Sequence, residues 1–218
     1  NTSELKFNNG SVATMNNSSI INNFGTGRFD SSLVTNFEFG GTYNTNYTAT
    51  NLFGPNTTLL SSGRITHPAN TTAKVYWLDL SFTNLQLNSG GYIDVDGKGY
   101  AMQQGPGASA TGGASHAAAG SNGSSIVYGS MVAPTDLGSG GKTTSGGGAV
   151  KLNISGNFTN NGSIRATGVS PTCGTSQGTG SGGSVWVNFT GGGTWTGTGT
   201  IEANAGYANN AACMAGGG

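Results

Sequence analysis

The sequence predicts an all-β protein: a parallel β-helix or related β-solenoid built from strand–turn–strand–Gly-rich-loop repeats, with an irregular N-terminal β region. Several short segments alternate apolar and polar residues with a period of two, as half-buried strands do. Pairs of such segments recur at intervals of about 35 residues and are followed by Gly-rich loops. Few Leu, Ala, Glu and Lys residues stand at helical spacing, which argues against long helices.

The repeats are clearest in the second half of the chain. Each copy has a first strand, a short polar turn, a second strand and a Gly-rich loop. The first strands are Tyr76–Phe82, Gly148–Ser155 and Gly183–Thr190, and the second strands are Gly91–Gly97, Gly162–Gly168 and Gly199–Asn204. In the last two copies the first strands begin 35 residues apart (183 − 148) and the second strands 37 apart (199 − 162).

The alternation assigns an inner face to each strand. We expect these side chains to point inward: Val150, Leu152, Ile154, Ile164, Ala166, Val185, Val187, Phe189, Ile201 and Ala203. A unit of this size cannot bury its apolar face alone, so successive copies must stack. A β-sandwich and an array of hairpins are the alternatives, and the fixed interval favours stacking.

Two regions are expected. Residues 1–72 form an irregular Asn/Thr-rich β region, either N-terminal rungs of the solenoid or a separate small β unit. Residues 73–218 hold the Gly-rich solenoid, with copies near 75–97, 148–168 and 183–204 and a long Gly-rich insertion at 98–147. Because a long structureless loop is uncommon in a compact domain, we expect the insertion to pack against its surroundings, with Tyr128, Met131 and Val132 as anchors.

Composition excludes several classes. The chain of 218 residues has 41 Gly and only eight basic and eight acidic side chains, which gives a net charge of zero. Such a chain has no electrostatic footprint for nucleic acid, and no apolar run approaches the ~18 residues that membrane insertion requires. Low net charge also argues against disorder, which usually accompanies high net charge.

Sequons point to a secreted, N-glycosylated protein. The Asn-x-Ser/Thr pattern occurs twelve times, about twice as often as the composition alone would give. The candidate acceptors are Asn9, Asn17, Asn46, Asn56, Asn70, Asn122, Asn153, Asn157, Asn161 and Asn188. Asn153 and Asn188 hold the same position in successive copies, so both should point outward. An Asn-rich bacterial surface protein with unused sequons is the alternative.

The two cysteines, Cys173 and Cys213, lie in the Gly-rich loops that follow the second strand of successive copies. Stacking would bring these loops together, so we expect a disulfide and an oxidising compartment. The absence of an initiator Met and of a signal peptide suggests a mature form or an excised portion.

Catalytic and cofactor chemistry finds little support. Asp94 and Asp96 are the only close pair of carboxylates, placed about 7 Å apart on one face of a strand, and they are candidates for glycoside hydrolysis or a calcium site. An Asp-x-Asp-Gly strand ending explains them equally well. His67 and His116 are isolated and are expected to be polar loop residues. We therefore expect no enzyme, no metal and no cofactor.

Two tryptophans fall at outward positions. Trp77 and Trp186 could stack on sugar rings, fill a subunit interface or lie under a loop. A second outward set, Asp94, Arg165 and Glu202, holds equivalent places in the three copies, so we expect a column in which Arg165 stands between two carboxylates.

The copies, of the form Gly-Gly-[Ala/Ser]-Val-x-[Leu/Val]-x-[Ile/Phe] then Gly-x-Ile-x-Ala, resemble the repeats of large Gly-rich surface proteins. These include bacterial adhesin-like proteins and protist extracellular glycoproteins such as those of tubular flagellar hairs (mastigonemes). The resemblance covers residues 75–218 and implies a β-solenoid without catalytic residues. We therefore expect a structural extracellular or cell-surface glycoprotein, a self-associating subunit or segment of a filament or surface layer. The next subunit, or sequence absent from this chain, should continue the stack at its open end. A carbohydrate-binding adhesin module and a polysaccharide-active β-helix enzyme are the alternatives.

Overall fold

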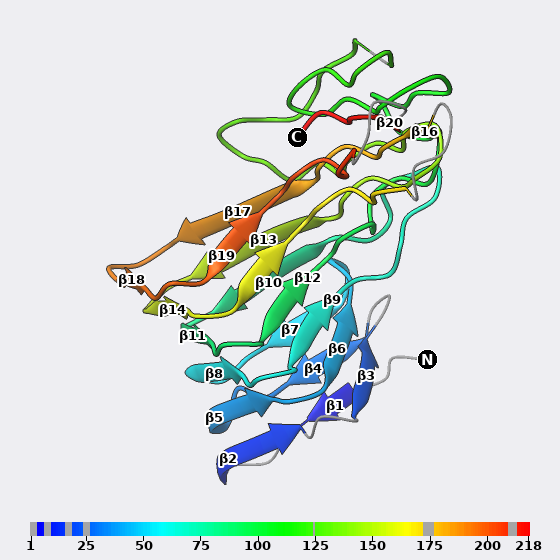
Figure 1. Cartoon of the computed structure of the whole chain (residues 1–218). Coiled ribbons are helices and arrows are strands. Elements are labelled where there is room, and N and C mark those ends of the chain that lie inside the picture. Colours follow the sequence, from blue (N-terminus) through cyan, green and yellow to red (C-terminus); the bar gives the residue numbers. More distant parts are fainter. Residues whose placement is uncertain are drawn as a thin grey trace.

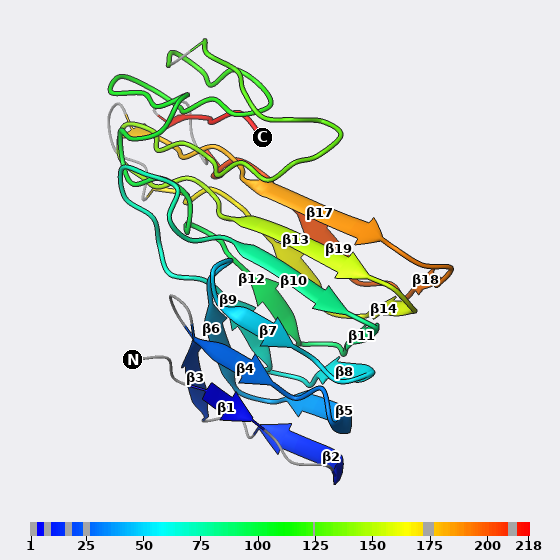
Figure 2. The ribbon, with the colours of Figure 1, turned by 180° about the vertical axis from the view of Figure 1, so that it is seen from behind.

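The protein is a stack of β-strands wound as a parallel β-solenoid, seen here in a computed structural model (Figures 1 and 2). The structure describes residues 4–6, 10–15, 19–23, 27–123, 125–171, 177–208 and 213–218. Every paired strand in these residues runs parallel to its neighbour. The predicted all-β solenoid is therefore confirmed.

Each turn of the solenoid, here called a rung, contributes one strand to each of three faces. The first face holds β1 (Glu4–Lys6), β4 (Arg28–Asp30), β7 (Thr50–Leu52), β10 (Leu78–Phe82), β13 (Ala149–Ile154) and β17 (Ser184–Phe189). The second face holds β2 (Gly10–Met15), β5 (Val34–Phe39), β8 (Asn56–Leu59), β11 (Asn84–Leu87), β14 (Phe158–Asn160) and β18 (Trp195–Thr196). The third face holds β3 (Ile20–Asn23), β6 (Thr42–Thr45), β9 (Arg64–Thr66), β12 (Tyr92–Asp94), β15 (Ser163–Arg165) and β19 (Thr200–Glu202).

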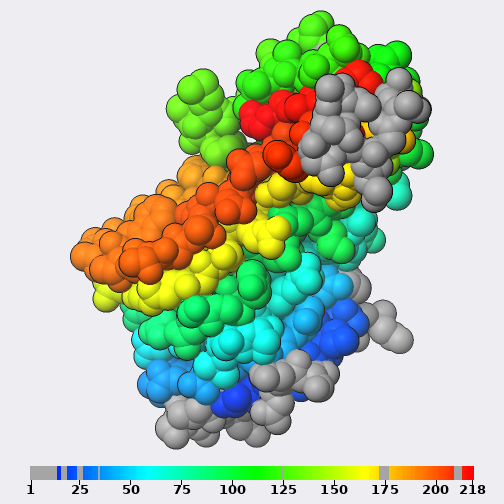
Figure 3. All heavy atoms as spheres, viewed as in Figure 1, coloured from blue at the N-terminus to red at the C-terminus, as the bar shows by residue number. Residues whose placement is uncertain are grey.

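The N-terminal third contributes rungs 1 to 3 of the same solenoid. Residue pairs such as Glu4 with Arg28 and Thr42 with Arg64 show that these rungs advance by 24 (28 − 4) and 22 (64 − 42) residues. The second and third faces each run as one six-stranded sheet across residue 72, so the strands on its two sides share sheets. In the space-filling view the layers follow one another in sequence order, from blue near the N-terminus to orange in rung 6 (Figure 3). The 35-residue interval of the later rungs does not apply here because the short rungs lack Gly-rich loops.

The repeat unit contains three strands rather than the two that the sequence suggested. The segment between the predicted strands, taken from the sequence as a polar turn, contains β14 in rung 5 and β18 in rung 6. Phe158 of β14 is fully buried and supplies the inward side chain of this middle strand. A strand of only three residues carries too little alternation to be recognised in a sequence.

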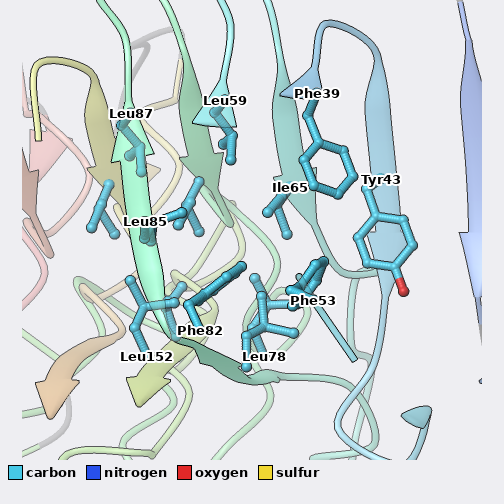
Figure 4. Close-up of a cluster of buried hydrophobic side chains, with 14 of the residues drawn as sticks. Phe39, Tyr43, Phe53, Leu59, Ile65, Leu78, Phe82, Leu85, Leu87 and Leu152 are labelled. Carbon is cyan, nitrogen blue, oxygen red and sulfur yellow. The ribbon is translucent and has the colours of Figure 1, made fainter. Parts of the chain in front are cut away.

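The core consists of inward side chains that stack in columns along the solenoid axis (Figure 4). On the third face, paired residues place Tyr43, Ile65, Ile93 and Ile164 in one such column, and each is completely buried. Burying each of these side chains stabilises the fold by about 1.5–3 kcal/mol. The predicted inward positions of the fifth rung are confirmed, since Val150, Leu152, Ile154, Ile164 and Ala166 have no exposed surface.

The first face is interrupted between rungs 3 and 4. Its strands form two three-stranded sheets, β1-β4-β7 and β10-β13-β17, and no ladder of the described residues pairs β7 with β10. The aromatic rings of Phe53 and Phe82 bridge the interruption, stacked with centroids 4.5 Å apart. Figure 2 shows the two sheets one above the other on this side of the molecule.

The Gly-rich loops of rungs 4 to 6 pack on one another as an ordered layer at one edge of the solenoid, beside β16 (Gln177–Gly178) and β20 (Cys213–Met214) (Figures 1 and 2). Backbone hydrogen bonds join neighbouring loops, for example Gly146 N to Tyr100 O at 3.0 Å and Gly147 N to Ser181 O at 3.0 Å. A Cβ atom on Gly183 would lie 1.8 Å from Gly148 O, so this close backbone approach requires glycine.

The insertion at 98–147 is part of this layer, and only one of its expected anchors holds it. The Tyr128 hydroxyl donates to Leu137 O at 2.6 Å and lies 2.7 Å from Ser139 Oγ. Met131 and Val132 are instead 98% and 87% exposed. Both apolar side chains are therefore almost completely exposed to solvent in the described chain.

The two histidines are buried, contrary to the expectation of polar loop residues. His67 follows β9 and has no exposed surface; its Nδ1 lies 2.7 Å from Pro68 O, and its Nε2 accepts a bond of 3.4 Å from Ala149 N. Burial lowers the pKa of His67 to about 4 and also lowers the pKa of His116. Neutral His67 thus connects rung 3 to the start of rung 5.

Candidate functional site

The two tryptophans lie on the outside of the first face, each beneath a lysine. Trp77 packs against Tyr47 with ring centroids 5.4 Å apart, and Lys74 Nζ stands 4.6 Å from its centroid. Lys151 Nζ stands 5.0 Å from the centroid of Trp186. Strand pairing aligns Trp186 with Lys151 and Asp79, not with Trp77. Both rings are only half-buried, and the structure does not bring them together as one platform.

Asn153 and Asn188 point outward at paired positions of β13 and β17, as the repeat predicted. Asn188 Nδ2 donates to Asn153 Oδ1 at 3.2 Å, and Asn153 Nδ2 donates to Asp79 Oδ1 at 2.8 Å. Asp79 also pairs with Lys151 at 3.3 Å. Polar side chains therefore form a hydrogen-bonded chain across three rungs.

The sequons differ sharply in accessibility. Asn122, Asn157 and Asn161 are exposed, while Asn56, Asn153 and Asn188 are half-buried. Asn157 and Asn161 use Oδ1 to accept bonds from Thr194 and Thr198 of the next rung, and no acceptor in the described chain engages either Nδ2. These two offer the nitrogen that carries an N-glycan. Asn9 and Asn17 lie outside the described residues.

The structure disfavours two of the sequons. Asn70 is 4% exposed, its Nδ2 donates to Tyr76 O and Lys98 O, and its Oδ1 accepts from two backbone N–H groups. Asn46 is equally buried, and its Oδ1 holds the following turn through Thr48 and Ala49. Attaching a glycan at Asn70 would break bonds that fix the chain between rungs 3 and 4, because both of its Nδ2 hydrogens are already donated.

The cysteine prediction cannot be read from the described chain. Cys213 begins β20 and is buried at 8% exposure, whereas Cys173 lies outside the described residues. The pairing of Gln177 with Cys213 does place the loops of successive rungs side by side. The Cys173–Cys213 disulfide stays a prediction.

The outward charges of the third face stack in the expected register but pair differently. Arg165 is aligned with Asp94 on one side and with Glu202 on the other. The guanidinium nevertheless binds Asp96, at 2.5 Å, and only approaches Glu202, at 4.0 Å. Asp94 binds Arg64 of the preceding rung at 2.9 Å. Both candidate catalytic carboxylates are therefore held by arginines.

Burial raises the pKa of Asp96, while the Thr167 N–H, 2.6 Å away, and Arg165 oppose that rise. Within the described chain no three His, Cys, Asp or Glu side chains form a metal-binding group.

A groove follows the ends of the first-face strands, along the solenoid axis. This axial groove has a volume of about 500 Å³ and crosses the interruption between rungs 3 and 4. Its lining includes Ser32, Leu52, Ser81, Asn153, Ser155 and Thr190, which come from rungs 2 to 6. Sequence reasoning missed it because no motif marks it; stacking of the rungs and the missing ladder between β7 and β10 create it.

The sixth rung forms an open apolar end. Ile201 and Trp195 are paired with the fully buried Ile164 and Phe158, yet they are 37% and 51% exposed. Beside this rung, the segment 127–134 overhangs the start of β17 and encloses a hollow of about 470 Å³ lined by Tyr128, Met131, Val185 and Ala203.

The described residues include no helix that could span a membrane. Comparison of the chain with protein families, with curated proteins and with solved structures gives no match. The open rung and the axial groove are therefore the two features on which function is argued.

Proposed function

We propose that the chain is a structural component of an extracellular filament or surface layer, in which its sixth rung stacks against the first rung of another copy. One observation carries the proposal: inward positions that are fully buried in rung 5 are only half-buried or exposed in rung 6. Ile164 and Phe158 have no exposed surface, whereas their partners Ile201 and Trp195 retain 37% and 51%. Soluble proteins seldom leave such a contiguous apolar surface without a partner.

Backbone geometry allows a second copy to be that partner. β17, β18 and β19 each occupy the outer edge of a sheet, and β1, β2 and β3 occupy the opposite edges in the same order. An edge strand exposes unpaired N–H and C=O groups that pair readily with another strand. Stacking rung 1 on rung 6 would add a strand to each of the three faces. Because the two surfaces differ, the contact is heterologous and builds a filament rather than a closed dimer.

The hollow beside rung 6 suits this contact. Val185 and Ala203 form its apolar floor, and the overhanging segment contributes Tyr128 and the fully exposed Met131. A stacked copy would cover these side chains and give Met131 the contact that it lacks in the single chain. The zero net charge adds no repulsion between copies.

The lateral faces support an extracellular location. Asn157 lies exposed between the first-face and second-face strands of rung 5, and Asn161 lies exposed between its second-face and third-face strands, at sequons whose Nδ2 atoms are available. Glycans there would keep the sides of the solenoid apart and restrict association to its ends. Glycopeptide mass spectrometry on material from the native source tests this part of the proposal, and unmodified Asn157 and Asn161 would contradict it.

Sedimentation velocity over a range of concentrations tests end stacking. We expect the chain to form rod-like oligomers that lengthen with concentration and that electron microscopy shows as filaments. Ile201→Lys places an ammonium group at the open rung, where the long side chain reaches water, and should reduce the association constant at least tenfold.

Thr58→Lys is the matched control, because it adds the same charge on the outside of β8 beside Glu38. This variant should assemble normally. A chain that stays monomeric at every concentration, or equal assembly by Ile201→Lys and wild type, would refute end stacking.

A further inference from the structure

The axial groove has the dimensions of an extended ligand. Its lining runs from Ser32 in rung 2 to Thr190 in rung 6. Neighbouring strands lie about 4.8 Å apart, so four rung intervals span about 19 Å. A groove of this length accommodates several pyranose rings in line, whereas a single small metabolite would fill only part of it.

Its chemistry selects an uncharged, hydroxyl-rich ligand. The hydroxyls of Ser81, Thr83, Ser155 and Thr190 all stand at exposed positions, and Asn153 adds an amide. Edges of the stacked Phe53 and Phe82 rings supply the apolar part of the lining. Among the residues that the structure describes, no Lys, Arg, His, Asp or Glu lines the groove, so a uronate, sialate or sulfate would find no counter-charge there.

The interruption of the first face supplies backbone hydrogen-bonding groups to the groove. β7 and β10 face each other without a ladder, which leaves backbone N–H and C=O groups of both strands without strand partners. Backbone groups that lack a ladder partner bond to water or to a ligand instead. Sugar hydroxyls both donate and accept, and they can meet either kind of group.

We propose that the axial groove binds a neutral pyranose oligosaccharide. Two sources share this chemistry. The first source is the protein itself: Asn153 and Ser155 of the sequon Asn153-Ile154-Ser155 line the groove, so an N-glycan on Asn153 can lie along it. The glycosylated Nδ2 atom would keep one hydrogen, which it can still donate to Asp79. Alternatively, the groove takes an oligosaccharide from outside.

The first test uses chain that carries no N-glycans, titrated by NMR and calorimetry with two neutral trisaccharides, N-acetylchitotriose and maltotriose. We expect at least one to bind, with chemical-shift changes at the groove residues, while the anionic trigalacturonate does not. Ser81→Trp fills the groove from an exposed position of β10 and should weaken binding at least tenfold.

Ser163→Trp is the matched control, since Ser163 lies on the outside of the third face and not in the groove. It should bind like wild type. No binding of either neutral trisaccharide at tens of millimolar, equal binding by Ser81→Trp, or preference for the anionic sugar would overturn the proposal.

The second test identifies the source, using chain made in a host that N-glycosylates. If the Asn153 glycan occupies the groove, the glycosylated chain will not bind the added trisaccharide, and trimming the N-glycans with an endoglycosidase, which leaves every groove side chain in place, will restore binding. If the ligand is external, both chains bind. Sedimentation of the same samples separates this result from end stacking, because Ser81→Trp should leave assembly intact and Ile201→Lys should leave sugar binding intact.

Discussion

Acidification should destabilise the fold through His67. This side chain is fully buried, and burial lowers its pKa from 6.5 to about 4. In the unfolded chain the imidazole regains its ordinary pKa and takes up a proton as the pH falls below 6.5. The folded chain resists that proton because its Nε2 accepts from Ala149 N and Lys98 adds an unfavourable positive charge. The stabilising contribution is thus complete above pH 6.5 and is lost on the way down to pH 4.

The two pKa values set the magnitude. A difference between 6.5 and about 4 corresponds to a maximum of about 3 kcal/mol in the free energy of unfolding. Between pH 7 and pH 5 the unfolded state becomes almost fully protonated and the folded state remains mostly neutral, so about 2 kcal/mol should be lost. The lowered pKa of His116 adds a contribution of the same sign.

Urea denaturation at pH 7, 6 and 5 measures this loss in wild type and in His67→Gln. The glutamine oxygen can still accept from Ala149 N but does not titrate, so the variant should retain only the pH dependence that His116 and other groups contribute. The difference in slope between the two proteins isolates His67. Equal pH dependence of unfolding in wild type and His67→Gln would refute the assignment of a neutral, buried imidazole.

Three further predictions concern the Gly-rich layer, the core and the cysteines. Gly183→Ala should lower the free energy of unfolding by about 3 kcal/mol or more, because its Cβ would lie 1.8 Å from Gly148 O. Gly192→Ala, where no atom lies within 4 Å of the added Cβ, should change that free energy by less than about 0.5 kcal/mol. Thermal denaturation compares the two variants, and similar melting temperatures would contradict the close packing of the layer. Leu152→Ala, in the closed fifth rung, should lower the free energy of unfolding by about 3 kcal/mol, and Val187→Ala, at the paired position in the open sixth rung, should lower it by about 1 kcal/mol. Chemical denaturation of the monomer measures both losses, and a larger loss for Val187→Ala would contradict the open end. Reducing a Cys173–Cys213 disulfide, which would close a loop of ~40 residues, should lower the free energy of unfolding by about 3–4 kcal/mol. Cys213→Ser should make the stability independent of the reductant. Two titratable thiols in the native, unreduced chain would contradict the disulfide.

Sequence alone determined the solenoid and much of its register. Val150, Leu152 and Ile154 recur as Val185, Val187 and Phe189, and the structure pairs them one to one. Period-two alternation and a constant interval suffice for this, because they fix both the inner face of a strand and its neighbour in the stack. The same reasoning placed Asn153 beside Asn188 and Arg165 between Asp94 and Glu202.

Only the tertiary structure showed the features that depend on contacts between rungs of unequal length. The N-terminal rungs advance by 20 to 24 residues, so no constant interval marks them. Arg165 binds Asp96 rather than Asp94, and His67 is buried against rung 5; both contacts join residues that are 69 (165 − 96) or more positions apart. The groove at the interruption of the first face results from a ladder that does not form. Local pattern carries no signal for such contacts, because they are set by how one rung sits on the next.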